Sequence, residues 1–201
     1  MVAKTFGSAV SGVDANLITI EVNVGQGTSF FMVGLPDSAV KESQQRVESA
    51  LKYFNYRMPR QKVVINLAPA DVRKEGSAYD LPIAMGILQA SEQVNFPELD
   101  RYIIMGELSL DGNLRPIKGV LPIAIEARKR GFKGFILPLE NAKEASIVNN
   151  IDIIGVETLD QAVDFLQGTL DIEPLVTDTR EIFYHSLDES EFDFADVQGQ
   201  E

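Results

Sequence analysis

The chain of 201 residues is 45% hydrophobic and 24% charged, a globular composition that excludes wholesale disorder. It contains no cysteine and one histidine, which excludes a disulfide scaffold, a cysteine nucleophile, a thiolate metal site and a histidine-rich metal site. No apolar run reaches the roughly 18 residues that span a membrane, and residues 1–10 lack the apolar segment of a signal peptide. We therefore expect a cytoplasmic protein without a membrane partner.

The formal net charge of −12 is unevenly distributed. Residues 171–201 hold ten acids and one base, which leaves a net charge of −3 for residues 1–170. The negative charge therefore argues strongly against nucleic acid binding only for the acidic end of the chain. Residues 171–190 show no sustained hydrophobic period, and we expect an acidic linker there, with the single histidine, His185, exposed and without a catalytic role.

The first thirty residues alternate between apolar and polar side chains, the period of a half-buried strand. This pattern predicts a strand over Ile18–Val24, a turn over Gly25–Gly27 and a returning strand over Thr28–Val33. The G-x-G in the turn lacks a third glycine and lies between two strands, so it favours a hairpin over a dinucleotide-binding loop.

A helix is predicted from Ser38 onward, with Asp37 as its N-cap. Its apolar positions share one face by their spacing, namely Val40, Val47, Leu51 and Phe54. A short buried strand, Val63–Leu67, follows. After a polar loop, residues 81–93 are apolar nearly all round, which predicts a buried helix.

The second half of the chain alternates strands and helices in short steps. The predicted elements are strands at 102–105, 135–138 and 151–155, a hairpin at 106–116, and helices at 118–130, 141–148 and 159–167. Together with the antiparallel beginning, this order predicts an α/β domain of the two-layer, α+β kind.

The sequence holds no phosphate loop of the form G-x-x-x-x-G-K-[ST]. The stretch from Gly112 to Gly119 comes nearest but has one glycine too few before Lys118. We therefore expect no cofactor, no metal and no ATP hydrolysis in this chain by itself.

The loop at residues 73–80 allows two interpretations. It could place backbone amides at a helix N-terminus around an anion or a developing oxyanion. Alternatively, Gly76 permits a tight turn and Ser77 or Asp80 caps the next helix. The spacing favours the second interpretation.

Basic residues form two groups that could contact the phosphates of DNA, with aromatic residues interleaved in the first. The simpler alternative is that they are solvated surface. The candidates are Arg57, Arg60, Lys62, Arg73 and Lys74, and, as a second surface, Arg128, Lys129, Arg130 and Lys133.

Several longer motifs resemble the N-terminal domain of the YifB/ComM family, also described as magnesium-chelatase-related or competence proteins. They are VGLPDSAVKES from Val33, RVESAL from Arg46, NLAPAD from Asn66, KEG from Lys74 and DLPIA from Asp80. The resemblance covers residues 1–168. Residues 194–200, FADVQGQ, resemble the opening of the family's AAA+ ATPase module, so that residues 169–201 would be a linker towards that module.

The resemblance implies the fold of ribosomal protein S5 domain 2 and of the Lon proteolytic domain. It also implies a longer protein that binds ATP and Mg²⁺, assembles with neighbouring protomers into a ring, and drives DNA remodelling as a helicase or branch-migration motor in recombination and natural transformation. An oligomerisation or protein-interaction module without DNA contact is the alternative.

The run GELSLDGNLRPIKGV from Gly106 resembles the Lon signature, whose peptidases use a Ser–Lys dyad. Aligned with it, the serine position falls on Ala78 and the lysine position on Leu121, and neither side chain can attack a carbonyl or transfer a proton. Ser77 and Lys118 lie close to these positions and leave residual peptidase activity as a third alternative. The resemblance thus implies that this chain is not an enzyme.

Overall fold

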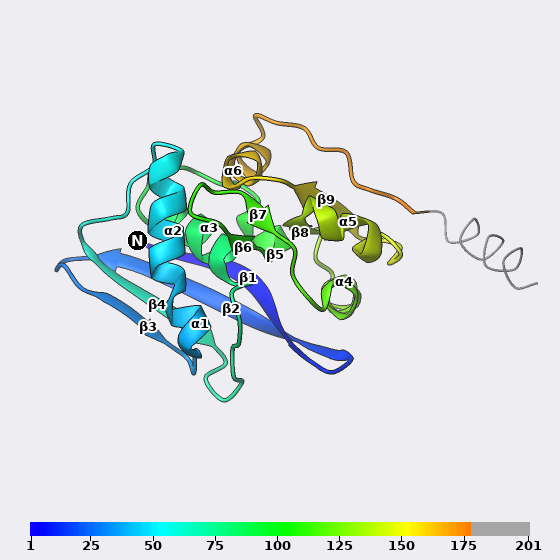
Figure 1. Cartoon of the computed structure of the whole chain (residues 1–201), viewed down its shortest axis with the longest axis horizontal. Coiled ribbons are helices and arrows are strands. Elements are labelled where there is room, and N and C mark those ends of the chain that lie inside the picture. Colours follow the sequence, from blue (N-terminus) through cyan, green and yellow to red (C-terminus); the bar gives the residue numbers. More distant parts are fainter. Residues whose placement is uncertain (178–201) are drawn as a thin grey trace, which may run out of the picture.

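The computed structural model describes residues 1–177, which form a seven-stranded mixed sheet in the order β3-β4-β2-β1-β5-β8-β9 (Figure 1). The strands are β1 (Val2–Ser11), β2 (Asp14–Gly25), β3 (Phe30–Val33), β4 (Lys62–Ala68), β5 (Tyr102–Ile104), β8 (Gly134–Pro138) and β9 (Asp152–Val156). β1 pairs antiparallel with β2, and β2 with β4, whereas the other four pairs are parallel.

The predicted hairpin over residues 18–33 is wrong. β2 turns back on β1 through Gly12 and Val13, while β3 pairs in parallel with β4, which lies between β2 and β3. β4 takes the inner place because its side chains at 63, 65 and 67 are all apolar and fully buried, or nearly so. Alternation predicts a strand and its faces, but it does not identify the neighbouring strand.

Six helices and one small hairpin accompany the sheet within residues 1–177. They are α1 (Ser38–Lys41), α2 (Ser43–Tyr53), α3 (Asp80–Ala90), α4 (Val120–Lys129), α5 (Leu139–Ala145) and α6 (Leu159–Gln167), a 3₁₀ turn at Leu99–Arg101, and the hairpin β6 (Glu107–Leu108) and β7 (Leu114–Arg115). The predicted α/β class is therefore confirmed.

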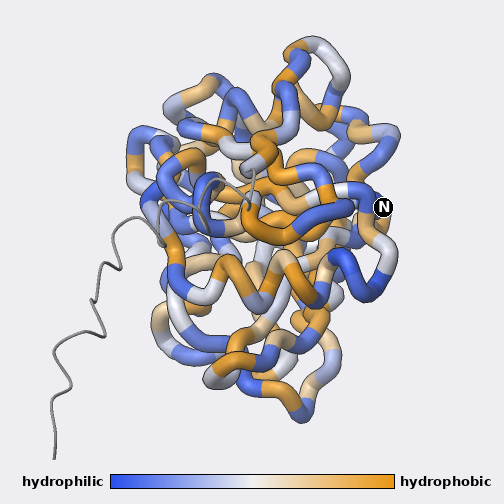
Figure 2. Tube along the Cα trace, turned by 90° about the vertical axis from the view of Figure 1, so that its right-hand side faces the viewer, coloured by the Kyte–Doolittle hydropathy of each residue, from blue (hydrophilic) through white to orange (hydrophobic). Residues whose placement is uncertain are grey.

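The central helix α3 is buried on ten of its 11 residues, as its apolar sequence predicts. It packs on β1 and β2, with α2 alongside it. Gly86 permits this contact, since a Cβ there would lie 2.6 Å from Cγ2 of Val22. In Figure 2 the hydrophobic segments run through the middle of the molecule and many hydrophilic segments lie at its rim.

The predicted first helix is two helices with a break at Glu42. Asp37 caps α1 as expected, because its Oδ1 accepts from the backbone N–H of Val40 at 2.7 Å. Val40, Val47 and Leu51 are fully buried, which confirms the predicted apolar face.

Two later helices differ from prediction at their ends. α4 begins at Val120 rather than 118, because Gly119 precedes it with a left-handed φ of 77°. α5 spans Leu139–Ala145 rather than 141–148.

One face of the sheet is covered by helices and the other is open around β1–β4. Side chains at 18, 20, 22 and 24 of β2 are buried, whereas those at 19, 21 and 23 reach the other side. We call this side the open face. Its residues, in cross-strand register, are Phe31, Val64, Asn23 and Val2 in one row and Val33, Asn66, Glu21 and Lys4 in the next.

The segment after α6 runs along the edge strand β9. The backbone N–H of Leu175 donates to the carbonyl of Ile153 at 2.9 Å, and the side chains of Ser146 and Thr177 are hydrogen-bonded. The remainder of the predicted linker, with His185 and residues 194–200, lies outside the described residues. No helix within residues 1–177 is both long and apolar enough to cross a membrane.

Candidate functional site

Of the two positions that align with the Lon-type dyad, Ala78 lines a cavity of about 410 Å³ and Leu121 does not. Ala78 lines this cavity together with Ser77, Glu107 and Lys118, which come from the loop before α3, from β6 and from the residues before α4. Leu121 is half-buried in the first turn of α4 and packs against the hydrophobic core. The cavity therefore has the methyl group of Ala78 at the position that the resemblance aligns with the Lon serine.

The near-miss residues do not form a Ser–Lys pair in this geometry. The hydroxyl of Ser77 donates to Oε2 of Glu107. Lys118 is exposed, and within the described residues its ammonium is in no hydrogen bond and no ion pair. Activation of a serine by lysine needs the amine within hydrogen-bond reach of the hydroxyl, and here a carboxylate takes that place.

Neither interpretation of the loop at 73–80 holds in full. Gly76 has a left-handed φ of 83° and makes the predicted turn, but neither Ser77 nor Asp80 caps α3. The amides of Gly76, Asp80 and Leu81 are already bonded, to Asp37, Ser77 and Gly106 respectively. These three amides are therefore not free to bind an anion.

Lys74 is a structural residue, and its prediction as a DNA contact is wrong. Its side chain is fully buried, and its ammonium donates to the backbone carbonyls of Gly34, at 2.8 Å, and Pro69. Burial lowers the pKa of this lysine. Because Asp37 also accepts from the amides of Val40 and Gly76, this network ties the GLPD motif to the KEG motif.

A buried ion pair joins the RVESAL and DLPIA motifs. Asp80 is fully buried and accepts from Nε of Arg46 at 2.7 Å, from Oγ of Ser43 at 2.5 Å and from the amide of Leu108 at 3.1 Å. Burial raises the pKa of Asp80, and the hydrogen bonds from Arg46, Ser43 and Leu108 act against that rise. The hydrogen bond to Asp80 raises the pKa of Arg46.

This pair holds α2, α3 and β6 together beside the cavity. Sequence reasoning did not find it, although the signal was present: Asp80 is the one charged residue at the start of an apolar helix. A lone charge in such a segment requires a partner, because an unpaired buried charge is very costly.

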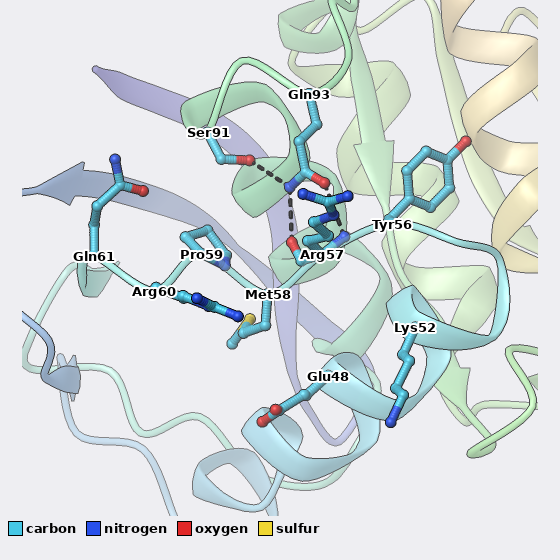
Figure 3. A pocket seen from close by; sticks show the side chains of 10 residues that line it. All are labelled: Glu48, Lys52, Tyr56, Arg57, Met58, Pro59, Arg60, Gln61, Ser91 and Gln93. Carbon is cyan, nitrogen blue, oxygen red and sulfur yellow. Dashed lines mark hydrogen bonds between the residues drawn. The ribbon is translucent and has the colours of Figure 1, made fainter.

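Arg57 and Arg60 lie in a second and larger hollow, of about 740 Å³, between α2 and the turn after α3. Figure 3 shows these two arginines with Lys52 and Glu48 around it. We call Lys52, Arg57 and Arg60 the groove cations. Within the described residues, none of the three lies within 4.0 Å of a carboxylate.

The backbone of the groove is fixed by one amide side chain. Gln93 accepts from the backbone N–H of Arg57 at 2.8 Å and donates to its carbonyl at 2.7 Å (Figure 3). Tyr56 points away from the arginines (Figure 3), towards Asp160, and burial raises its pKa, with Asp160 as the second cause. Gln93 thus holds the backbone of Arg57, and the Tyr56 hydroxyl is not directed at the groove cations.

The other predicted bases are placed differently. Lys62 lies on the open face with its ammonium 5.3 Å from the ring centroid of Phe31. Three bases are in ion pairs with glutamates, which are Arg73 with Glu75, Arg130 with Glu126 and Lys133 with Glu98. Arg128 and Lys129 are exposed at the end of α4. The five bases of the first predicted group therefore do not form one surface, since Lys74 is buried and Lys62 lies on the open face.

Comparison with known proteins gives several similarities. Residues 20–141 match the family model described as subunit ChlI of Mg-chelatase. Competence protein ComM of Haemophilus influenzae is 40% identical over 201 residues, which cover 99% of this chain and 39% of ComM. The uncharacterized protein YifB of Escherichia coli is 42% identical over 195 residues, which cover 96% of this chain and 37% of YifB.

A shorter similarity extends to a peptidase. Lon protease 2 of Bacillus subtilis is 30% identical over 129 residues, or 63% of this chain and 23% of that protein. The chain spans about two fifths of the length of its ComM and YifB relatives.

Proposed function

Since this chain belongs to the family described as subunit ChlI of Mg-chelatase and matches the N-terminal domain of YifB and ComM, we propose that it is the non-catalytic, Lon-like N-terminal domain of an ATP-driven DNA motor. In this proposal the motor acts in recombination and natural transformation, in the cytoplasm. The observation that carries the proposal is the similarity to a competence protein over 99% of the chain.

The absence of peptidase chemistry is supported by the cavity. A serine peptidase needs a hydroxyl and a base at the dyad positions, and this chain has Ala78 and Leu121 there. Ser77 could substitute only if its hydroxyl left Glu107 for Lys118. An active-serine probe on the wild type and on Ser77→Ala tests this directly, since labelling that disappears in the variant would establish a rearranged dyad.

ATP and Mg²⁺ are expected to bind outside these 201 residues. The nearest approach to a phosphate loop, residues 112–119, leads into α4, but it contains strand β7 and has one glycine too few before Lys118. The residues present do not suit a nucleotide phosphate group, so the ATPase would be supplied by another part of the complete protein.

The contribution of this domain would be to hold DNA through the groove cations. Three cations without carboxylate partners in the described residues, one of them on a backbone that Gln93 holds, suit the phosphates of a nucleic acid strand. The groove cations are suited to phosphates and not to the edges of bases, so the contact would be independent of the base sequence.

The alternative is an assembly module that contacts only neighbouring protomers or other proteins. The experiment that separates the two uses the full-length protein on branched DNA, with ATP and Mg²⁺. ATP-dependent strand exchange that weakens when the groove cations are neutralised supports the proposal. Full activity with neutralised groove cations would leave only the assembly role for this domain.

A further inference from the structure

The edge of β1 that faces β5 is free over its last residues. β1 pairs with β2 along its whole length, whereas it pairs with β5 at one position only, Phe6 with Ile103. Beyond that position, Ser8 and Val10 of β1 line the cavity of about 410 Å³ that also has Ala78 in its wall. Within residues 1–177 no other strand pairs with this part of β1 on the cavity side. An unpaired strand edge is a template for pairing with another extended chain.

The backbone groups of Val10 point towards this free edge. Ser11 and Asp14 close a two-residue hairpin turn, so they form a hydrogen-bonded pair, and the two kinds of pair alternate along an antiparallel ladder. The next pair, Val10 with Ala15, is then of the kind without hydrogen bonds, and the amide and carbonyl of Val10 point away from β2. Within the described residues, neither group takes part in a bond outside the strand ladders. Val10 thus has one donor and one acceptor available to another chain.

Ser8 confirms this alternation, because both of its backbone groups have partners on the cavity side of β1. Its carbonyl accepts from the hydroxyl of the buried Tyr79 at 3.1 Å, and its amide donates to the sulfur of Met105 at 3.4 Å. Tyr79 and Met105 both line the cavity. A thioether sulfur is a weak acceptor, so a carbonyl from an incoming chain would be a better partner for the amide of Ser8.

The walls of the cavity are held in place by hydrogen bonds of the protein itself. Asn141 accepts from the backbone N–H of Ile117 at 2.9 Å and donates to its carbonyl at 3.0 Å. On the other side, the amide of Gly106 donates to the carbonyl of Ala78 at 2.8 Å. Binding to walls that are already ordered costs less free energy than binding to walls that must be ordered first. The cavity, at about 410 Å³, lies in the size range of ligand pockets.

The charges around the cavity leave one cation without a partner. Glu75 is ion-paired with Arg73 at 2.8 Å, and Glu107 accepts from Ser77. Lys118 is exposed, and its ammonium has no hydrogen bond or ion pair to any described residue. An acidic side chain complements Lys118, whereas the two carboxylates would repel a run of phosphates.

We propose that an extended segment of a partner protein adds to the free edge of β1 at Val10 and places an acidic side chain beside Lys118. In such strand addition, main-chain hydrogen bonds give affinity and a cavity for the side chains gives selectivity. The inference goes beyond DNA binding, since Val10 and Lys118 line a different hollow from the groove cations. It requires no nucleophile, which agrees with the presence of Ala78 in the cavity wall.

Fluorescence anisotropy of blocked, labelled pentapeptides with the full-length protein tests the charge preference. One set has glutamate at the centre with valine, alanine or leucine around it, and the matched set has lysine at the centre. The glutamate set is expected to bind at least about fivefold more tightly, and Lys118→Glu should reverse that order. Lys129→Glu makes the same charge change at the exposed end of α4, outside the cavity, and should leave the order as it is.

The main-chain bonds have a readout of their own. Val10→Pro removes the free amide donor and leaves the β1–β2 ladder intact, because that amide lies outside the ladder. It should weaken peptide binding at least about fivefold, while Val10→Thr, which keeps the amide and the branched shape, should bind like the wild type. Methylation of the peptide's backbone amides tests the same bonds without changing the protein, and it should abolish binding.

Three results would overturn the proposal. The first is the absence of binding by either peptide set up to about 1 mM, and the second is equal binding of the methylated peptides, which would exclude an added strand. The third is displacement of the peptides by a single strand of DNA, in the wild type and in Arg57→Gln with Arg60→Gln alike, which would assign the cavity to nucleic acid.

Discussion

Replacement of Arg46 by methionine should destabilise the domain strongly, because it leaves the carboxylate of Asp80 buried without its counter-charge. Arg46 donates to Asp80 from Nε at 2.7 Å and from Nη2 at 3.1 Å, and Asp80 is fully buried. Removing one partner of a buried pair costs about 3–5 kcal/mol. The side chain of Arg46 is 19% exposed, so water reaches the pair from that side and we expect a loss near the lower end, about 3 kcal/mol.

The cost should depend on pH in a defined direction. Burial raises the pKa of Asp80, and Arg46 opposes that rise. Without Arg46 the pKa of Asp80 rises further, so the folded variant takes up a proton more readily than the unfolded chain as the pH falls. Folding that is coupled to proton uptake is favoured by acid, and the difference in stability between wild type and variant should shrink below neutral pH.

Urea unfolding followed by circular dichroism measures this effect on the 201-residue chain. A loss of about 3 kcal/mol corresponds to a fall in Tm of roughly 6–12 °C for a domain of this size. The double variant Arg46→Met with Asp80→Asn should lose less stability than the two single variants together, since it leaves neither an unpaired arginine nor an unpaired carboxylate. A single-variant loss below about 1 kcal/mol at neutral pH, or a loss that does not change with pH, would refute the reasoning.

Three further variants test other parts of the framework. Gly34→Ala should cost at least about 3 kcal/mol in urea unfolding, because φ is +99° and a Cβ would lie 2.1 Å from the carbonyl oxygen of Leu67; a loss under 1 kcal/mol would contradict this close approach. Lys74→Met should cost about 2 kcal/mol, since the carbonyls of Gly34 and Pro69 lose their donor, while DNA affinity stays within about twofold; a large drop in affinity would show that Lys74 contacts DNA. Tyr79→Phe should cost about 1 kcal/mol through the lost 3.1 Å bond to the carbonyl of Ser8, and an unchanged urea midpoint would argue against that bond.

The buried face of each predicted element was predictable from the sequence. The period of Val40, Val47 and Leu51 identified one buried helix face, and the nearly all-apolar run at 81–93 identified the central helix, which ends at Ala90. These patterns are local, and burial follows directly from them.

Strand order and the roles of the charged loop residues were not predictable in the same way. β4 separates β2 from β3 although 36 residues lie between the end of β2 and the start of β4, and nothing in residues 18–33 indicates that partner. Lys74 lies in a polar loop, where a base is expected at the surface, yet its ammonium donates to the carbonyl of Gly34, 40 residues away, as well as to that of the nearby Pro69. Both outcomes depend on contacts between segments that are far apart in the chain.

The positions of the basic residues at the candidate site also depend on contacts that the sequence pattern does not show. Sequence grouped Arg57, Arg60 and Lys62, but Lys62 lies on the open face while the two arginines remain in the groove. The ion pair between Lys133 and Glu98 could not be predicted from sequence spacing, since the two residues are 35 positions apart. The pairs with Glu75 and Glu126 are local.

Salt-dependent binding of a labelled single strand to the full-length protein tests the central claim most directly. Each phosphate contact contributes a slope of about 0.7 in a plot of log affinity against log salt, so Arg57→Gln with Arg60→Gln should lower the slope by about 1.4 and weaken binding at low salt. Arg128→Gln with Lys129→Gln removes the same charge from α4 and should leave both unchanged. Equal affinities and slopes for wild type and the groove variant would contradict the account.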